Sequence, residues 1–317
     1  MKAIRVEEFG EPEVLQLVET PEPTAAPNEL LIRIHVAGIN PVDTYIRAGK
    51  YAAKPPLPYT PGKDGAGIVE RSAGRFAKGA RVFIAAANGG TYAELAAVPA
   101  DQVFRLPEAT SFEQGAALGV PYGTAHRALF SRGNARAGET VLVHGASGGV
   151  GTAAVQLAHA AGLRVFGTAG TEEGRKLVRD NGADEVFDHR ADDYQDRILE
   201  ATGGRGVALI LEMLANVNLG KDLKLLAKAG RVVVIGSRGA VEIDPRDLMQ
   251  RDADIRGIML GAASPEERTH MYEEIAHGLE KGTLQPVIGQ TFPLAQAAEA
   301  HRAVLAPGAY GKIVLRP

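Results

Sequence analysis

The chain has 317 residues, of which 45% are hydrophobic and 23% are charged, and its formal net charge at pH 7 is -3. This length suits two globular domains, and the nearly balanced charge excludes a general electrostatic attraction to nucleic acid or to anionic membranes. The sequence contains no cysteine, which excludes disulfide bonds, cysteine-bound iron–sulfur clusters and cysteine-ligated zinc.

Short apolar runs separated by proline and glycine fill the first part of the chain, up to about Leu118. Several short runs with turn residues between them predict a mainly β domain. The predicted strands cover residues 2–6, 30–38, 67–70, 81–85 and 92–98.

From about Thr124 onward, strand-like and helix-like segments alternate, which predicts a doubly wound parallel sheet of the α/β class. The predicted strands cover residues 141–144, 164–168, 185–188, 207–214, 231–236 and 255–260, and the helices between them begin at Gly148 and cover 172–181, 192–201 and 219–229. A further helix is predicted from a Ser264 cap to Glu280, and a last strand covers residues 311–315.

Residues 141–157 combine a buried strand, a glycine turn and a helix in immediate succession. Within them Ala146-Ser-Gly-Gly-Val-Gly151 occupies the frame of the G-x-G-x-x-G fingerprint, with Ala146 in place of the first glycine. Gly148 is expected to let the backbone approach a pyrophosphate, and Gly151 to let helix and strand pack closely. The strand before and the helix after the turn favour a bound dinucleotide over a turn that binds nothing.

The order of these elements predicts two domains. Residues 124–261 are expected to form the dinucleotide-binding Rossmann domain, and residues 262–317 to rejoin residues 1–123. Because ligands of open α/β sheets bind at the carboxyl ends of the strands, we expect the cofactor cleft between the two domains.

Several long blocks together resemble one protein family. They are Asn40-Pro-Val-Asp-Thr-Tyr-Ile-Arg-Ala-Gly49, Leu57-Pro-Tyr-Thr-Pro-Gly62, residues 141–151, Gly167-Thr-Ala-Gly-Thr-Glu-Glu-Gly174, Glu212-Met-Leu-Ala-Asn-Val-Asn218 and Ile235-Gly-Ser-Arg238. Over essentially its whole length the chain resembles the medium-chain dehydrogenases/reductases, and within them the zeta-crystallin-type NADPH:quinone oxidoreductases. The resemblance implies a mainly β, GroES-like catalytic domain beside the Rossmann domain.

The zinc-dependent members of this superfamily hold a catalytic zinc ion with a cysteine, a histidine and a second cysteine. By position in the resemblance, Asn40, Lys63 and Val120 stand at these three places, so the resemblance implies a member without zinc and without its Lewis acid. Lys63 is then expected to be an exposed loop charge. The eight histidines show no HExxH or similarly clustered spacing, so we expect no metal site elsewhere.

The choice between the two nicotinamide dinucleotides depends on the end of the second strand of the Rossmann domain. Folds that prefer NAD carry a carboxylate there, which binds the adenine ribose. This strand ends Phe166-Gly-Thr-Ala-Gly170 without one, and Thr171 leaves further room for a 2′-phosphate. Arg175 and Lys176 are candidates to neutralise that phosphate, so the sequence favours NADPH over NADH.

The resemblance implies further cofactor contacts at matching positions. Tyr45 is expected near the nicotinamide and Gly170 near the adenine ribose. At His189 the alternative is a cap of the next helix, and at Arg238 a solvated loop charge. The expected pyrophosphate contacts are Ser147, Gly148, Gly149 and Val150, and the other cofactor-lining positions are Lys176, His189, Asn218, Ile235, Gly236, Ser237, Arg238, Ile258, Met259 and Leu260.

Hydride transfer to a quinone needs positioning and hydrogen bonds to a developing oxyanion more than strong acid catalysis. Asn40 and Tyr45, which we expect on one loop, can supply these hydrogen bonds. Asp43 is expected to be ionised at neutral pH and to orient its neighbours. Tyr51 and Tyr59 are candidate walls for a planar ring, with ordinary packing as the alternative.

The resemblance thus implies NADPH-dependent reduction of quinones. Reduction of the C=C bond of an enone or enoyl thioester uses the same hydride geometry and stays open as an alternative. A different class of function is a nucleotide fold that serves RNA binding or crystallin-like accumulation. The sequence has no arginine-rich tract to support RNA binding.

Residues 255–260 are expected to form the last strand of the parallel sheet. An exposed apolar edge of this kind is commonly covered by a second copy, so we expect a homodimer. No apolar run is long enough to span a bilayer, and the first residues predict a strand rather than a signal peptide. We therefore expect a cytoplasmic protein with no membrane partner.

Overall fold

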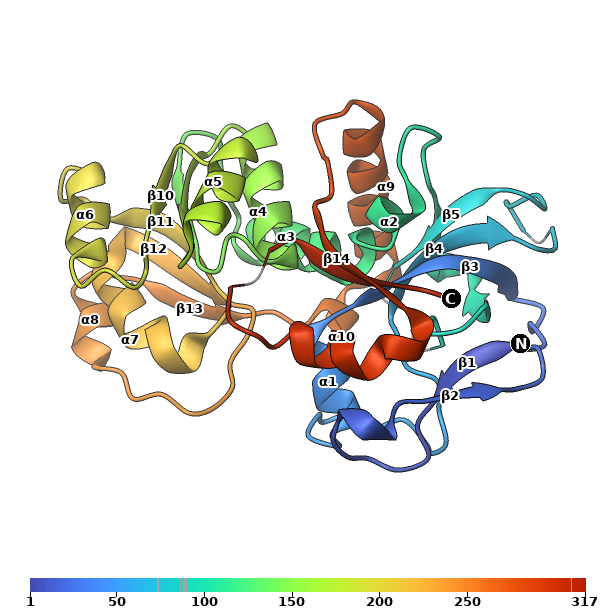
Figure 1. Ribbon diagram of the computed structural model, residues 1–317. Coiled ribbons are helices and arrows are strands. Elements are labelled where there is room, and N and C mark those ends of the chain that lie inside the picture. Colours follow the sequence, from blue (N-terminus) through green and yellow to red (C-terminus); the bar gives the residue numbers. More distant parts are fainter. Residues whose placement is uncertain (73, 86, 88–89, 309) are drawn as a thin grey trace. The chain divides into compact units, whose positions relative to one another are not determined.

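The computed structural model describes residues 1–72, 74–85, 87, 90–308 and 310–317. Its internal contacts divide the chain into two compact units (Figure 1). Unit 1 comprises Met1–Gly123, Ser264–Pro307 and Gly311–Pro317, and unit 2 comprises Thr124–Ala263 and Gly308–Tyr310. Within the described ranges, no helix is both long enough and apolar enough to cross a membrane.

Unit 1 is built on a seven-stranded sheet in the order β14-β15-β3-β4-β5-β7, with β6 pairing with β3 off this path. Along β3, buried Leu30 and Ile32 alternate with exposed Arg33 and His35, because one face of the strand covers the core. A separate hairpin joins β1 (Lys2–Arg5) to β2 (Gln16–Glu19). The sheet strands are β3 (Glu29–Ile39), β4 (Asp64–Val69), β5 (Arg81–Ile84), β6 (Leu95–Pro99), β7 (Val103–Arg105), β14 (Ile288–Pro293) and β15 (Lys312–Arg316).

The helices of unit 1 come from both ends of the chain. The longest, α9 (Pro265–Glu280), begins and ends where the sequence predicts, because Ser264 accepts a hydrogen bond from the Glu267 N–H at 3.1 Å. The others are α1 (Pro41–Arg47), α2 (Phe112–Gly115) and α10 (Ala297–Ala303). One hydrophobic cluster contains Ile4 and Tyr92 together with Leu294 and Leu315, so the carboxyl-terminal segments complete the core of the amino-terminal part.

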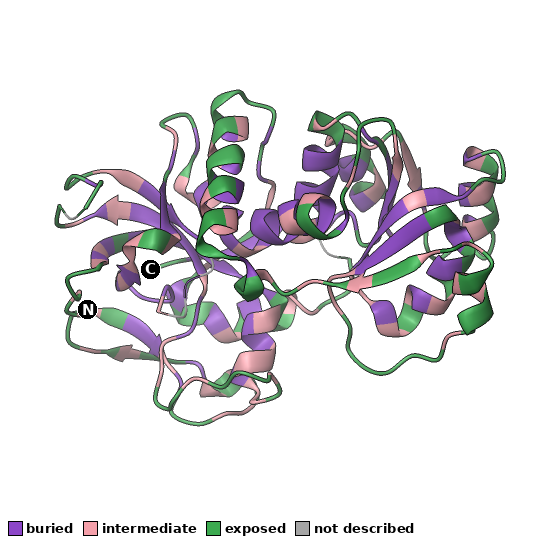
Figure 2. Ribbon diagram, turned by 180° about the vertical axis from the view of Figure 1, so that it is seen from behind, coloured by how far each residue is buried: buried purple, intermediate pink, exposed green. Residues whose placement is uncertain are grey.

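Unit 2 contains a six-stranded parallel sheet in the order β10-β9-β8-β11-β12-β13. This is the doubly wound order, so the predicted α/β class is confirmed. Val141 and Leu142 are completely buried because helices cover both faces of the sheet. In Figure 2 parts of this sheet are purple, and other parts are pink or green. The strands are β8 (Thr140–Val143), β9 (Arg164–Thr168), β10 (Glu185–Phe187), β11 (Val207–Glu212), β12 (Leu226–Val234) and β13 (Asp254–Gly257), and the helices are α3 (Gly123–His126), α4 (Gly149–Ala160), α5 (Glu172–Asp180), α6 (Tyr194–Ala201), α7 (Ala215–Leu225) and α8 (Pro245–Met249).

The helix predicted over residues 219–229 is wrong in its bounds. Helix α7 begins at Ala215 and ends at Leu225, and β12 starts directly at Leu226. Both leucines are buried in the same core, so tertiary packing rather than local periodicity sets the end of the helix. Ala229 then adopts a left-handed conformation with φ +57°, which the pattern of side chains in the sequence does not predict.

Strand β13 lies at the edge of the sheet and pairs with β12, as predicted, although it ends at Gly257 rather than at residue 260. A short 3-10 turn, Leu260–Ala262, follows it. Ile255 is 37% exposed and Met259 is 59% exposed. The sheet therefore ends in an edge that carries exposed apolar side chains.

Candidate active site

The glycine turn of unit 2 connects β8 to α4 (Figure 1). Gly148 is the N-cap of α4, and a Cβ on Gly151 would lie 2.3 Å from the carbonyl oxygen of Gly145. Gly145 has a φ of +56°, whereas Ala146 needs no such freedom, which explains why alanine replaces the first glycine of the fingerprint. The turn therefore presents the first N–H groups of α4, which have no partners within the helix and attract a phosphate.

A second group forms where β9 ends, around Gly170. A Cβ on Gly170 would lie 2.8 Å from the Nε of Arg190 and 3.0 Å from the ring of His189, so both side chains cover this glycine. A Cβ on Gly174 would lie 3.0 Å from the Oγ1 of Thr171 and 3.3 Å from the Oγ of Ser147. We call Ser147, Gly170, Thr171, His189 and Arg190 the β9 group.

The β9 group unites residues from separate segments that the sequence assigned to the cofactor, and it adds Arg190, which sequence reasoning missed. The signal in the sequence that could have identified Arg190 is its position directly after His189, which was a predicted cofactor contact. His189 does not cap the following helix, because Asp193 stands at the N-cap of α6.

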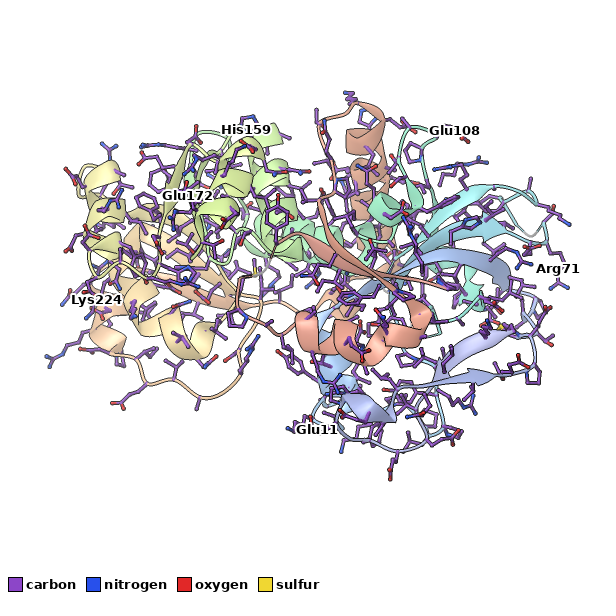
Figure 3. The ribbon with its side chains drawn as sticks, viewed as in Figure 1. Glu11, Arg71, Glu108, His159, Glu172 and Lys224 are labelled. Atoms are coloured by element: carbon purple, nitrogen blue, oxygen red, sulfur yellow. The ribbon has the colours of Figure 1, made fainter. Side chains whose placement is uncertain are left out.

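Lys176 lies outside the β9 group in every contact that the described residues make. Its ammonium is 2.6 Å from the carboxylate of Asp180 on the same helix, and its side chain is 71% exposed. Arg175 is engaged by Asp188 at 2.6 Å and by Glu172 at 2.7 Å. Glu172, labelled in Figure 3, is thus a surface partner of arginines on α5 and not a carboxylate of the β9 group.

Two other predicted cofactor segments lie side by side past β11 and β12. The N–H of Ala215 donates to the carbonyl of Gly236 at 2.9 Å, and the N–H of Arg238 donates to the side chain of Asn216 at 2.8 Å. The Asn218 amide donates to the Glu212 carboxylate at 3.2 Å.

The remaining predicted cofactor-lining residues lie along the same edge of the sheet. The N–H of Ile258 donates to the carbonyl of Val234 at 3.2 Å, and the carbonyl of Met259 accepts a hydrogen bond from Arg127 at 3.2 Å. Ile235 donates to the carbonyl of Glu212 at 2.8 Å, while the side chains of Ser237 and Arg238 are exposed. Leu260 begins the 3-10 turn after β13.

In unit 1, the segment that we expected to be a loop is a helix. Asn40 caps α1, and its N–H donates to the carboxylate of Asp43 at 2.8 Å. Pro41 is favourable at the first helical position, because the N–H that proline lacks would have no partner within the helix there. The negative charge of Asp43 interacts favourably with the positive end of the helix dipole. The helical start therefore sets the orientation of both Asn40 and Asp43.

The side chain of Asn40 belongs to a buried ionic cluster, which we define as Asn40, Asp64 and Lys312. The Lys312 ammonium lies 2.6 Å from the Oδ1 of Asn40 and 2.8 Å from the Oδ2 of Asp64. The Asn40 amide donates to Asp64 at 2.8 Å, and the Val120 N–H donates to Asp64 at 2.7 Å. These contacts fix which end of the Asn40 amide is oxygen, and among the described residues they use one of its two N–H bonds.

Asp43 lies beside this cluster at the start of a second hydrogen-bonded chain. The Tyr92 hydroxyl lies 3.3 Å from the Asp43 carboxylate and 3.2 Å from the Nε2 of His301. Burial raises the pKa of Asp43 to about 6, against the opposing Asn40 N–H, so this carboxyl is still mainly ionised at pH 7 but titrates closer to neutrality than an ordinary aspartate. Burial, assisted by Arg47, lowers the pKa of His301 to about 3, which keeps this imidazole neutral at pH 7.

The predicted tyrosines have more open positions. Tyr45 lies on α1 and Tyr51 follows that helix, and both are partly exposed, as is Tyr59. Tyr45 is two residues from Asp43, so the two side chains leave different faces of the helix. Among the contacts of the described residues, none joins Tyr45 or Tyr51 to the ionic cluster.

Sequence reasoning missed Asp64, Tyr92, His301 and Lys312. The signal for Lys312 was a charged residue at the start of an otherwise apolar strand, because a lysine is almost never fully buried without a partner. Lys63 also differs from its prediction. It is half-buried, and its ammonium donates to the carbonyl of Ala87 at 3.3 Å.

The side chains at the three positions that correspond to zinc ligands do not fit a zinc ion. The Asn40 oxygen already accepts from the Lys312 ammonium, and Lys63 offers an ammonium without a lone pair. Val120 contributes only its N–H, which donates to Asp64. The positive charge that contacts Asn40 and Asp64 is the buried ammonium of Lys312.

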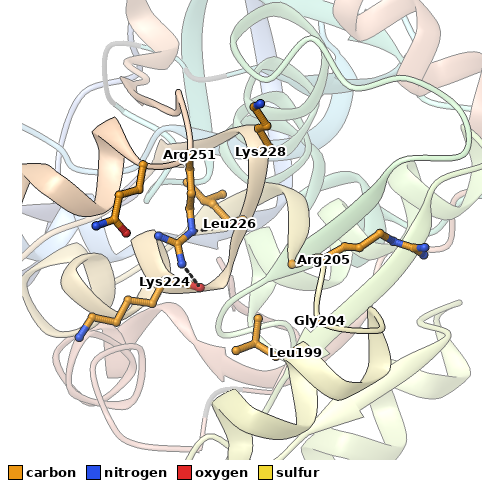
Figure 4. Close-up of a pocket in the computed structure, with 9 residues that line it drawn as sticks. Leu199, Gly204, Arg205, Lys224, Leu226, Lys228 and Arg251 are labelled. Carbon is orange, nitrogen blue, oxygen red and sulfur yellow. Dashed lines mark hydrogen bonds between the residues drawn. The ribbon is translucent and has the colours of Figure 1, made fainter.

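A pocket of about 370 Å³ lies on unit 2 near the starts of β11 and β12 (Figure 4). It is open to solvent and bordered by basic side chains. In Figure 4 the guanidinium of Arg251 donates to the carbonyl of Lys224 at 3.1 Å. Because the pocket lies at the amino ends of these strands, it is separate from the edge where a parallel sheet binds nucleotides. Its lining comprises Leu199, Gly204, Arg205, Gly206, Lys224, Leu226, Lys228, Gln250 and Arg251.

Comparison with known proteins matches one part of each unit of the chain to a protein family. Residues 149–277 match the zinc-binding dehydrogenase family, and residues 26–108 match the alcohol dehydrogenase GroES-like domain. The quinone oxidoreductase of Homo sapiens is 51% identical over 320 residues, which span 99% of this chain and 97% of the human protein.

Solved structures agree with this similarity. The quinone oxidoreductase of Escherichia coli, solved in complex with NADPH, matches with a TM-score of 0.89 and 31% identity over 100% of both chains. A NAD-dependent alcohol dehydrogenase matches with a TM-score of 0.93 and 29% identity, also over 100% of both chains. By its full-length identity to the human protein, the chain is an oxidoreductase of the medium-chain dehydrogenase/reductase family and belongs to the branch of the zeta-crystallin-like quinone oxidoreductases.

Proposed function

We propose that this protein reduces small quinones with NADPH, by hydride transfer and without a metal ion. The observation that carries the proposal is the buried cluster of Asn40, Asp64 and Lys312, in which the side chain of Asn40, at a position that the resemblance matches to a zinc ligand, is held by hydrogen bonds to a carboxylate and an ammonium. A quinone accepts a hydride without a Lewis acid if its oxygen is positioned and hydrogen-bonded. The names of the human and Escherichia coli relatives support the same acceptor.

NADPH fits the residues of unit 2. Bound there, it would supply the hydride. The glycine turn, with Ser147, Gly148, Gly149 and Val150, would hold the pyrophosphate at the start of α4. Arg190 and Thr171 of the β9 group would hold the 2′-phosphate, because a guanidinium binds phosphate with two parallel hydrogen bonds. The absence of a carboxylate in Phe166-Gly-Thr-Ala-Gly170, and the NADPH in the Escherichia coli structure, support the same nucleotide.

The residues of unit 1 would act on the acceptor. The remaining N–H of the Asn40 amide and the hydroxyl of Tyr45 are donors for a quinone oxygen as it gains negative charge. Lys312 and Asp64 keep the amide from rotating, so its donor needs no reorganisation during the reaction. A quinone that gains a hydride and a proton becomes a hydroquinone, and Tyr51 is proposed to contact its ring.

The direct test follows oxidation of NADPH by absorbance with a panel of small quinones. We expect turnover with several quinones, and faster turnover with NADPH than with NADH. The same panel includes enones and enoyl thioesters. No turnover with any quinone, or turnover only with the unsaturated carbonyl compounds, would overturn the proposed acceptor.

A further inference from the structure

Four buried polar side chains meet at the carboxyl edge of the sheet in unit 2, and we call them the edge network. His144 follows β8, Thr168 ends β9, Glu212 ends β11, and Asp222 lies on α7. Each is at most 3% exposed. The strand order of a doubly wound sheet reverses between β8 and β11. The network therefore lies at the topological switch point.

One imidazole joins the members of the network. The Nε2 of His144 lies 2.9 Å from Asp222 and 3.6 Å from Glu212, and its Nδ1 lies 3.3 Å from the Thr168 hydroxyl. One histidine thus connects two carboxylates on one side to a hydroxyl on the other. A packing role alone would not require two buried acids against one imidazole.

Both arms of the network end on segments that we assign to the dinucleotide. The Thr168 hydroxyl accepts a hydrogen bond from the Gly145 N–H at 3.2 Å, so one arm reaches the glycine turn. On the other arm, the Glu212 carboxylate accepts from the Leu214 N–H and, at 3.2 Å, from the Asn218 amide. A change of charge inside the network therefore acts on the backbone at both ends.

When Glu212, Asp222 and His144 are all deprotonated, the network carries two negative charges and no positive charge. The Oε2 of Glu212 and the Oδ2 of Asp222 accept no hydrogen bond from the described residues. One carboxylate oxygen of Glu212, one of Asp222 and a ring nitrogen of His144 all lie within 4.8 Å of one another. Two buried carboxylates this close are expected to share a proton, and a protonated His144 balances the remaining charge. Among the described residues, the titratable groups that interact electrostatically with the network include Lys221 of α7, Tyr194 of α6 and His189 after β10.

The direction of each pKa agrees with shared protons. Burial lowers the pKa of His144, but the charges of Asp222 and Glu212 outweigh burial, so the pKa is raised overall. Burial, opposed by the charge of His144 and assisted by the neighbouring Asp222, raises the pKa of Glu212 to about 7. Both shifts favour the protonated form, so the network loses its protons as the pH rises above neutrality.

We propose that His144, Glu212 and Asp222 are positioning residues for the dinucleotide, and that their shared protons hold the glycine turn and the Leu214–Asn218 loop in the binding geometry. The inference rests on the proposed function only in that a nicotinamide dinucleotide binds at this edge. Loss of the protons leaves unpaired buried negative charge close to the place of the pyrophosphate. The affinity for an anionic dinucleotide then falls.

The test measures the dissociation constant of NADPH by calorimetry between pH 6 and pH 9, with the full-length protein and with Asp222→Asn, Glu212→Gln and Lys224→Gln. Lys224 lies exposed on the same helix as Asp222 and serves as the matched control. We expect the affinity of the natural protein to fall about fivefold or more across this range. Asp222→Asn and Glu212→Gln should flatten that dependence, and Lys224→Gln should keep it.

The phosphate of NADPH also titrates, but this contributes equally to the pH dependence of the dissociation constant in all four proteins. It therefore cancels when their profiles are compared. An equal loss of affinity at every pH in Asp222→Asn, or an unchanged profile in both network variants, would overturn the inference. So would one equivalent of divalent metal in the natural protein that is absent from His144→Gln, since the network would then be a metal site. If one variant fails to fold, the other decides, and failure of both to fold would assign the network to stability alone.

These outcomes separate the inference from the proposed function. Binding is measured without an acceptor, so an inactive protein that binds NADPH with the expected pH dependence would refute quinone reduction and support the network. Turnover of quinones with a pH-independent NADPH affinity would do the opposite. Steady-state measurements with NADPH varied at a saturating quinone concentration add a further check, because positioning residues should change KM for NADPH more than kcat.

Discussion

The buried ammonium of Lys312 illustrates how much one side chain can decide in this protein. It is 3% exposed and neutralises Asp64, which is completely buried. Removal of one partner from a buried pair leaves the other charge without compensation. Lys312 therefore links stability to the orientation of Asn40.

We expect Lys312→Met to lower the free energy of unfolding by about 3–5 kcal/mol. Activity should also fall, because the Asn40 amide loses the partner of its oxygen. Arg316→Gln, at the exposed end of the same strand, removes a surface pair with Glu113 and should cost at most about 1 kcal/mol. Urea unfolding of both variants checks this, and equal losses would show that the burial of Lys312 is unimportant.

Asp43 should make stability depend on pH. Its pKa is raised in the folded protein to about 6, so the folded state holds a proton that the unfolded state releases between pH 4 and pH 6. The free energy of unfolding contributed by this group is then highest below pH 4 and decreases as the pH rises through 6. Asp43→Asn should flatten this part of the profile, whereas the exposed Asp101→Asn should not, as unfolding at several pH values can show.

Arg190 and Lys176 provide a direct contrast between structure and sequence. The structure favours Arg190 as the partner of the 2′-phosphate, because it covers Gly170, whereas Lys176 is paired with Asp180. We expect Arg190→Gln to reduce the preference for NADPH over NADH by about tenfold, since a charge-assisted phosphate contact contributes about 1.5–3 kcal/mol. Ratios of kcat/KM for the two nucleotides test this, and a larger effect of Lys176→Gln would reverse the assignment.

At the scale of elements, the glycine turn depends on close approach of α4 to the end of β8. Gly151→Ala would bring a methyl group within 2.3 Å of the Gly145 carbonyl oxygen, so the helix and the turn must separate. We expect loss of NADPH binding together with lower stability. Gly220→Ala on α7 is the matched control, because its methyl group would meet only Glu242 at 3.5 Å.

The control substitution should leave stability unchanged or increase it by about 0.5–1 kcal/mol through helix propensity. Thermal unfolding and calorimetric titration with NADPH distinguish the two variants. Full NADPH affinity in Gly151→Ala would show that the turn does not need close contact with the helix.

At the scale of the whole molecule, we propose that the protein is a homodimer through strand β13. This edge strand carries Ile255, 37% exposed, and Met259, 59% exposed, follows it. An edge strand with exposed apolar side chains is commonly covered by a symmetric copy. Light scattering should give twice the chain mass of 33.4 kDa.

Ile255→Lys should yield folded monomers, because a charge on the edge opposes pairing. A monomeric mass for the natural protein at micromolar concentration would contradict the proposal. Circular dichroism of the variant serves as the control for folding.

Features that depend on neighbouring residues could be predicted from the amino-acid sequence. The strand, turn and helix over residues 141–151 and the Ser264 cap of α9 follow from local patterns, and the structure confirms these elements. The alternation of elements likewise indicated the doubly wound sheet. Local chemistry suffices there because apolar period, capping and glycine geometry act within a few residues.

The pairing of residues that lie far apart in the chain could be read only from the folded protein. Lys312 and Asp64 are 248 residues apart in the chain, and His144 and Asp222 are 78 apart, so no local pattern could pair them. The end of α7 was mispredicted for the same reason, since burial of Leu226 in a common core overrides helical periodicity. Buried charges are stable only with partners, and those partners are chosen by the fold.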